Sequence, residues 1–185
     1  EGYPIRSAVF QNVKKVIKCG DPSMGHALYH CDHCGKFKHV SFTCKSRFCN
    51  SCGAKYTQDR AESISSKLIR CTHRHIVFTI PQELRVFFRK DRSLLHILFK
   101  ACSDTIFNYF YKLNKSENFK PGFVSTLHTF GRDLKWNPHI HMLLTEGASG
   151  LKTVWRKVKH IPFNMLRKRW QATLLSLLYK RLGPS

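Results

Sequence analysis

Two histidines separated by one residue, His139 and His141, are the side chains in this sequence best suited to chemistry. They begin an apolar run, residues 139–144, of a kind typical of β-strands. Alternate side chains of a strand point to the same face, so the two imidazoles would project together while Ile140 enters the core. Neutral imidazole is the commonest metal ligand, and such a pair could hold one divalent ion with positions left open for substrate oxygens. A bare His-x-His motif is also found as an exposed pair without function, and that alternative stays open at this point.

Four of the eight cysteines form two C-x-x-C pairs, Cys31 with Cys34 and Cys49 with Cys52, separated by fourteen residues. This spacing is close to that of four-cysteine zinc sites. The segment that contains the pairs has almost no aliphatic residues and cannot bury enough apolar surface to fold unaided. Four thiolates fill the coordination tetrahedron of Zn²⁺, so the sequence predicts a structural zinc site at these four residues.

Other ligand sets remain possible for the same zinc ion. Cys44, His30 or His33 could replace one of the four cysteines, and the sequence does not decide between them. The three remaining cysteines, Cys19, Cys71 and Cys102, are expected to be ordinary small core residues.

The charge of the chain points to an anionic partner. Its 185 residues include 32 Lys and Arg against 11 Asp and Glu, a formal net charge of +21. Nucleic acid is the first candidate partner for so strong a positive field, and an anionic membrane surface is the second. The sequence has no apolar run of membrane-spanning length and no signal-peptide pattern, so we expect a cytoplasmic protein with reduced thiols and no membrane partner.

Cations and aromatic residues alternate around the cysteine pairs. The candidate DNA contacts are Lys36, Lys38, Lys45, Arg47, Lys55, Arg132 and Lys135. The interleaved aromatic residues are Phe37, Phe42, Phe48 and Tyr56. These rings could stack on unpaired bases, or they could form the miniature core of a zinc module.

The pattern of apolar residues predicts an α+β fold in two parts. Residues 1–70 form a helical and zinc-binding module, and residues 71–185 form a sheet domain. The predicted helices cover residues 1–18, 56–70 and 84–113, with a last helix beginning at Pro162, and the predicted strands cover residues 75–80, 122–129 and 139–145. The last two strands are antiparallel if their short link makes a hairpin.

Two stretches resemble a known family. Residues 41–53, Ser-Phe-Thr-Cys-Lys-Ser-Arg-Phe-Cys-Asn-Ser-Cys-Gly, resemble the N-terminal zinc-binding region of the two-tyrosine rolling-circle transposases of bacterial insertion sequences. Residues 127–141, followed by Thr145-Glu146-Gly147, are similar to the HUH motif of that family, with Ile140 as the hydrophobic residue. The resemblance extends from about Cys19 to Trp170.

The resemblance implies a mechanism, partners and a location. His139 and His141 would hold a catalytic Mg²⁺ or Mn²⁺ at a scissile phosphate of single-stranded DNA, with His128 or Glu146 as a third ligand. A tyrosine would attack, leaving a 5′-phosphotyrosine and a free 3′-hydroxyl for strand transfer in DNA transposition and recombination. The partner would be the single-stranded ends of the element, in the nucleoid of a bacterial cytoplasm.

The sequence departs from the family at the nucleophile. The family's tyrosines lie downstream of the HUH strand in a Tyr-rich motif, whereas Tyr179 is the only tyrosine after His141 and its surroundings do not match that motif. Tyr109 and Tyr111 are expected to pack within a helix. We therefore expect a fragment truncated before the tyrosine motif, which could be inactive alone.

Two other functions remain open from the sequence. One is a zinc-dependent DNA-binding remnant without nuclease activity, and the other is a related replication initiator or relaxase. The sequence does not give the element ends or the oligomeric state.

Overall fold

The computed structural model describes residues 4–183 and divides the chain into two compact units, with the boundary between Leu68 and Ile69. The sequence-based boundary between residues 70 and 71 lies two residues further along. Helices and antiparallel strands occur in both units, which confirms the α+β class. The first residues of the expected N-terminal helix, 1–3, lie outside the described part of the chain.

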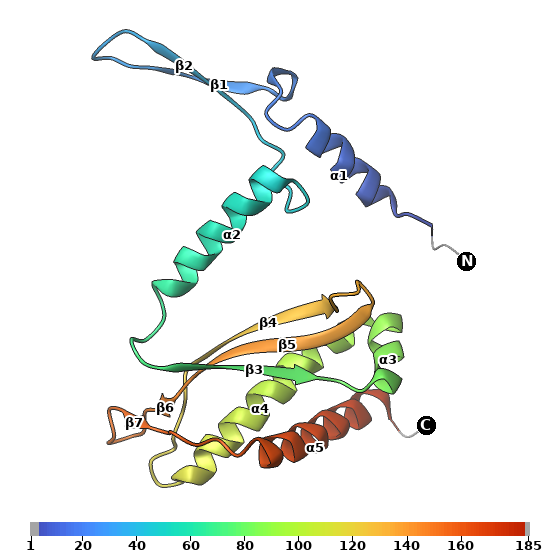
Figure 1. Cartoon of the computed structure of the whole chain (residues 1–185), viewed down its shortest axis with the longest axis vertical. Helices are drawn as coiled ribbons and strands as arrows, with labels where there is room; N and C mark the ends of the chain where they lie inside the picture. Colours follow the sequence, from blue (N-terminus) through green and yellow to red (C-terminus); the bar gives the residue numbers. More distant parts are fainter. Residues whose placement is uncertain (1–3, 184–185) are drawn as a thin grey trace. The chain divides into compact units, whose positions relative to one another are not determined.

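The first unit consists of two helices and a hairpin (Figure 1). In chain order these are α1 (Ser7–Ile17), a short 3-10 turn (Pro22–Met24), β1 (His26–His30), β2 (Phe37–Ser41) and α2 (Asn50–Ser65). The antiparallel β1–β2 hairpin was not expected from the sequence. Helix α2 begins directly after Cys49, six residues before the predicted start, so the second C-x-x-C pair lies in the first turn of a helix.

The first unit has almost no apolar core. Among residues 4–68, Cys49 is the one residue that is buried, with 6% of its surface exposed. Among the apolar side chains of α1, Phe10 and Ile17 are more than half exposed. Burial of apolar surface therefore cannot be what holds this unit together.

The second unit is a three-stranded antiparallel sheet covered on one face by helices (Figure 1). Its main elements are β3 (His73–Thr79), α3 (Arg85–Lys90), α4 (Leu95–Leu113), β4 (Phe123–Phe130), β5 (Trp136–Thr145) and α5 (Phe163–Leu182). The strand order is β3-β5-β4, so β5 pairs with a neighbour on both sides. A small ribbon, β6 (Gly147–Ala148) with β7 (Arg156–Lys157), follows the sheet, and short 3-10 turns cover residues 82–84 and 92–94.

The core lies between the sheet and the helices α4 and α5. Alternate residues of β5, Ile140, Met142 and Leu144, are fully buried there, together with Leu98 and Ile106 of α4. Because alternate residues of a strand face opposite sides, the remaining residues of β5 project from the face that carries no helix.

The single helix predicted over residues 84–113 is wrong in one respect, because the chain breaks at Asp91. This residue has extended dihedral angles (φ −121°, ψ 102°), and its carboxylate accepts a hydrogen bond from the backbone N–H of Ser93 at 2.8 Å. A short acidic side chain that bonds nearby backbone offers an alternative to the helical ladder, which explains the break between α3 and α4. Among residues 4–183, every helix is too short or too polar to cross a lipid bilayer.

Candidate metal centres

Four cysteines meet in the first unit: Cys19, Cys44, Cys49 and Cys52. Their sulfur atoms all lie within 4.8 Å of one another. The Sγ–Sγ distances are 3.6 Å between Cys19 and Cys52, 3.7 Å between Cys44 and Cys52, and 3.8 Å between Cys19 and Cys49. Tetrahedral zinc with sulfur bonds of about 2.3 Å places its sulfur atoms about 3.8 Å apart. The donor atoms and their spacing therefore fit a four-thiolate zinc ion.

Local backbone contacts hold these thiols in place. Cys19 follows α1, Cys44 follows β2, and the other two cysteines begin α2. The backbone N–H of Cys44 donates to the Sγ of Cys19 at 3.4 Å. The turn also requires Gly53, because a Cβ at this position would lie 2.8 Å from the carbonyl oxygen of Arg47.

The thiols of Cys19 and Cys52 differ in pKa. A hydrogen bond from the side chain of Thr43, aided by Cys19 and Cys44, lowers the pKa of the Cys52 thiol to about 7. The backbone N–H of Cys44 lowers the pKa of Cys19, but hydrogen bonds with the neighbouring thiols and burial outweigh it and raise that pKa to about 12. Cys52 therefore supplies a thiolate more readily than Cys19 does.

The structure does not bring the predicted set Cys31, Cys34, Cys49 and Cys52 together. Cys31 and Cys34 are exposed in the turn of the β1–β2 hairpin. That turn is closed by hydrogen bonds from Gly35 N–H to Cys31 O (2.8 Å) and from Cys31 N–H to Lys36 O (3.0 Å). The C-x-x-C spacing of Cys31 and Cys34 is that of a tight turn, but this turn joins the two strands of a hairpin. Cys19 and Cys44 lie beside Cys49 and Cys52 instead of this pair.

The structure places all three alternative ligands of the zinc site. Cys44 is in the cluster, as one alternative foresaw, whereas His30 and His33 lie outside it. Cys19 was expected in the core and is instead a member of the cluster. Cys102 is a fully buried core residue, as expected, and burial raises the pKa of its thiol.

Three histidines meet on the helix-free face of the second unit's sheet. His128 of β4 lies directly opposite His139 of β5, and His141 follows two residues later on the same face. One nitrogen of each ring lies within 4.8 Å of the others. The ring centroids are 4.3 Å apart for His128 and His141, and 4.9 Å apart for His139 and His141. Three imidazole nitrogens at this spacing can ligate one divalent ion.

Hydrogen bonds and burial prepare two of these rings for a metal. The Nδ1–H of His139 donates to the carbonyl oxygen of Asn137 at 2.6 Å, which leaves its Nε2 lone pair free. Burial, followed by the nearby imidazoles of His128, His139 and His75, lowers the pKa of His141. The lowered pKa favours the neutral ring of His141, which is the form that ligates a metal.

Glu146, the other candidate third ligand, is occupied elsewhere. Its Oε1 accepts hydrogen bonds from Nε (2.8 Å) and Nη2 (2.5 Å) of Arg74. It is not part of the histidine cluster. His128 is therefore the candidate that the structure places with His139 and His141.

The tyrosines of the second unit lie on the helices that cover the opposite face of the sheet. Tyr109 and Tyr111 are on α4, and Tyr179 is on α5. Tyr109 packs in the core as expected, and its hydroxyl donates to the carbonyl oxygen of His160 at 3.1 Å. Within residues 69–183, the histidine face thus carries no tyrosine.

The candidate DNA contacts are all exposed: Lys36, Lys38, Lys45, Arg47, Lys55, Arg132 and Lys135. The aromatic residues between them are exposed too, from 40% for Tyr56 to 65% for Phe48. The guanidinium of Arg47 lies over the ring of Tyr56, 4.4 Å from its centroid. These rings are therefore surface groups, and the alternative that they form a miniature core is wrong.

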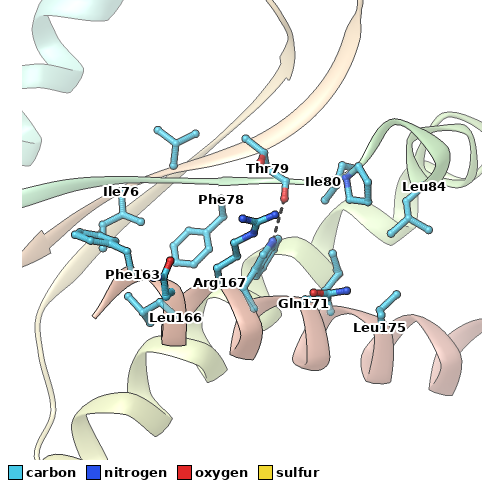
Figure 2. A pocket seen from close by; sticks show the side chains of 15 residues that line it. Ile76, Phe78, Thr79, Ile80, Leu84, Phe163, Leu166, Arg167, Gln171 and Leu175 are labelled. Atoms are coloured by element: carbon cyan, nitrogen blue, oxygen red, sulfur yellow. Dashed lines mark hydrogen bonds between the residues drawn. The ribbon is translucent and has the colours of Figure 1, made fainter. Parts of the chain in front are cut away.

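A groove of about 620 Å³ runs between β3 and α5, away from the histidines (Figure 2). Its walls are mainly apolar, with Phe78 from the strand, Ile80 directly after it, and Leu166 and Leu175 from the helix. The Nε1–H of Trp170 donates to the carbonyl oxygen of Thr79 at 2.9 Å across it. None of the three clustered histidines lines the groove.

Two residues of these centres escaped the sequence analysis. Cys19 has no second cysteine at C-x-x-C spacing, so its sole signal was its presence in a cysteine-rich region. His75 opens the apolar run of β3 as His139 opens that of β5, and its Nε2 lies 2.7 Å from Nδ1 of His141. A search for histidines at the starts of β-rich runs would have found it.

Comparisons with known proteins agree with this arrangement. A family model described as "Transposase zinc-binding domain" matches residues 2–80, and one described as "Putative transposase" matches residues 122–183. The chain is 34% identical over 170 residues to the "Transposase for insertion sequence element IS801" of Pseudomonas savastanoi pv. phaseolicola, covering 90% of this chain and 40% of that protein. It is 26% identical over 166 residues to the "Putative transposase y4qJ" of Sinorhizobium fredii (strain NBRC 101917 / NGR234), covering 89% of this chain and 40% of that protein.

The chain thus spans about two fifths of the length of these curated relatives. No solved structure matches it significantly. The two family models match in order along the chain, one over the cysteine cluster and one over the histidine cluster, and both relatives match across nearly all of it. Over nearly all of its length the chain is therefore similar to transposases of insertion sequences, and its first 80 residues include the match to a transposase zinc-binding domain.

Proposed function

We propose that this chain supplies the DNA-binding module and the metal-binding sheet of a rolling-circle transposase that nicks single-stranded DNA. The observation that carries the proposal is the group of three imidazoles on the helix-free face of the sheet. The similarity to transposases and the net charge of +21 support DNA as the partner.

In this proposal His128, His139 and His141 hold a Mg²⁺ or Mn²⁺ ion. When bound, the ion supplies Lewis acidity that withdraws charge from the scissile phosphate. The chain's own part is to present three ring nitrogens from paired strands. The hydrogen bond from His139 to Asn137 fixes one of these rings, and ladder pairing fixes the position of His128 opposite it.

Cys19, Cys44, Cys49 and Cys52 hold a structural zinc ion in the proposal. The ion joins the end of α1, the end of β2 and the start of α2, which substitutes for the missing apolar core. The exposed cations around it neutralise phosphates, and the exposed rings of Phe48 and Tyr56 can stack on unpaired bases.

The bond exchange in the proposal is a transesterification. The phenol oxygen of a tyrosine bonds to phosphorus, the bond from phosphorus to the 3′-oxygen breaks, and the 3′-oxygen takes up a proton to balance the one that the phenol loses. The nucleophile is not assigned to Tyr109, Tyr111 or Tyr179, since all three lie on helices of the opposite face.

A covalent-adduct assay tests this function. Purified chain is incubated with Mn²⁺ and labelled single-stranded oligonucleotides that carry candidate element ends, and the products are separated under denaturing conditions. The function predicts a Mn²⁺-dependent adduct when this chain is joined to a downstream segment that carries the tyrosine nucleophile, and the loss of that adduct in the double variant His139→Ala, His141→Ala. Cleavage that persists in the double variant would contradict it.

The placement of the tyrosines favours a second candidate, zinc-dependent DNA binding by this chain without cleavage of its own. In that case the chain binds single-stranded DNA, the binding requires zinc, and no adduct forms with any oligonucleotide. The double histidine variant would then bind DNA as well as the unaltered chain does.

A further inference from the structure

A fourth imidazole stands beside the histidine cluster and has no role in the function proposed so far. His75 belongs to β3, the strand on the other side of β5 from His128. Val77 lies directly opposite His141 in the β3–β5 ladder, and His75 is two residues before Val77. His75 therefore projects from the same face of the sheet as His141.

The contact between His75 and His141 is a well-aligned hydrogen bond. Nε2 of His75 lies 2.7 Å from Nδ1 of His141. The two ring planes are inclined by only 11° and their centroids are 4.9 Å apart. The centroid separation is close to the sum of the Nε2–Nδ1 distance and the centroid-to-nitrogen distance within each ring. The two nitrogens therefore lie close to the straight line that joins the two ring centroids. The hydrogen shared by them thus lies near the plane of both rings, where lone pairs point.

The direction of this hydrogen bond decides whether His141 can bind a metal. A neutral imidazole carries one N–H and one lone pair. If His75 donates, Nδ1 of His141 is the acceptor and its Nε2 carries the hydrogen, which blocks that nitrogen. If His141 donates from Nδ1, its Nε2 keeps a free lone pair.

We infer that His75 is a positioning residue for His141: its Nε2 accepts the Nδ1–H of His141 and so keeps Nε2 of His141 free as the metal-binding nitrogen. The inference rests on the proposed function, since that function makes His141 a ligand. His75 does for His141 what the carbonyl of Asn137 does for His139 through a 2.6 Å hydrogen bond. Partners of this kind fix both the tautomer and the orientation of a ligating ring.

The position of His75 explains why it is a partner and not itself a ligand. It is not in the group whose nitrogens lie within 4.8 Å of one another, which consists of His128, His139 and His141. Its Nε2 is already engaged with His141.

Metal affinity of the full chain gives the first test. The probe is Mn²⁺, with the free ion measured by electron paramagnetic resonance. His75→Phe keeps a flat ring without nitrogen and should weaken Mn²⁺ binding about 10- to 100-fold, the usual cost of losing such a partner. His75→Gln offers a carbonyl oxygen as acceptor and should bind nearly as tightly as the unaltered chain. His73→Phe is the matched control, since His73 is on the same strand and face but outside the cluster, and it should leave the affinity unchanged.

The ring tautomer of His141 gives a second test that needs no metal. Nitrogen-15 chemical shifts of the metal-free chain should show His141 with hydrogen on Nδ1 in the unaltered protein and in His75→Gln. In His75→Phe the hydrogen should move to Nε2, the tautomer that neutral histidine prefers in water.

The outcomes separate this inference from the function it rests on. If the unaltered chain binds no Mn²⁺ but His141 changes tautomer in His75→Phe, the catalytic metal of the proposed function is wrong and the positioning role stands. If Mn²⁺ binds and His75→Phe changes neither affinity nor tautomer, the positioning role is wrong. Equal loss of affinity in the Phe and Gln variants would also overturn it, because that result would make His75 a direct ligand.

Discussion

At the scale of single residues, the structure brings together a different set of four cysteines from the set that the C-x-x-C spacing predicts. The sulfur atoms of Cys19 and Cys44 lie beside those of Cys49 and Cys52, while Cys31 is in a solvent-exposed hairpin turn. Zinc binding provides much of the folding free energy of small zinc modules, so the ligands and the exposed cysteine should respond differently to substitution.

We therefore predict that Cys19→Ser purifies with much less zinc than the unaltered chain and melts at a lower temperature. Cys31→Ser is the matched control and should retain one zinc per chain. Elemental analysis by mass spectrometry and thermal melts by circular dichroism measure both effects. Loss of zinc in Cys31→Ser with retention in Cys19→Ser would restore the ligand set expected from the two C-x-x-C pairs.

A second residue-scale prediction concerns the third ligand of the histidine centre. His128→Ala should weaken Mn²⁺ binding at least tenfold, since it removes one of three ring nitrogens. Glu146→Gln should leave Mn²⁺ affinity unchanged and lower stability instead, because Arg74 loses a charged partner that is largely shielded from water. Isothermal calorimetry with Mn²⁺ and urea denaturation separate the two effects. A loss of Mn²⁺ binding in Glu146→Gln would make the carboxylate a ligand.

The sequence identifies a site residue when a second residue of the same type lies close to it along the chain. His139 and His141 are two apart on one strand, and Cys49 and Cys52 are three apart at one turn, so local geometry brings each pair together. Cys19 and His75 join these pairs from 30 and 66 residues away, respectively. Such partners are brought together by tertiary structure, which the spacing of residue types does not encode.

At the scale of secondary structure, β5 links the core to the candidate metal centre. Its buried side chains anchor the strand to α4 and α5, while its alternate side chains carry the histidines. The period of two in its apolar pattern made this strand predictable. The break between α3 and α4 was not, because apolar periodicity continues across residues 84–113 and the interruption depends on one side-chain hydrogen bond of Asp91.

The contact of α5 with the edge strand β3 gives an element-scale prediction. Trp170 packs against Phe78 with ring centroids 5.0 Å apart and donates from Nε1 to the carbonyl oxygen of Thr79. Trp170→Phe should lower the free energy of unfolding by about 1 kcal/mol for the lost hydrogen bond together with a smaller packing loss. Trp170→Ala should cost about 3–5 kcal/mol, because it also leaves a cavity.

Urea denaturation followed by circular dichroism measures both changes. Gln171→Ala is the matched control, because Gln171 is the exposed next residue of the same helix, and it should be nearly neutral. Equal stability of the Trp170→Phe and Trp170→Ala variants would contradict a role in packing.

At the scale of the whole molecule, the two units are stabilised by different means. The first has one buried residue among residues 4–68 and a four-thiolate cluster, whereas the second has a continuous apolar core. Removal of the metal abolishes the stability that comes from metal binding. The stability that comes from burial of apolar surface remains.

Removal of zinc should therefore unfold the first unit and spare the second. All three tryptophans, Trp136, Trp155 and Trp170, belong to the second unit, so their fluorescence reports on that unit alone. A strong chelator should lower the helical circular dichroism signal while the tryptophan emission maximum stays constant, and added Zn²⁺ should restore the signal. A red shift of the emission on chelation would show that the second unit also depends on the metal.

Within residues 69–183, no helix of the second unit covers the sheet face that carries the histidine cluster. A polymer can enter a closed pocket only by one of its ends. Any point along a polymer can approach an open, flat face. If the proposed function holds, this unit can engage a DNA strand in its interior without threading. Circular strands, which have no ends, would then be as accessible to it as linear ones.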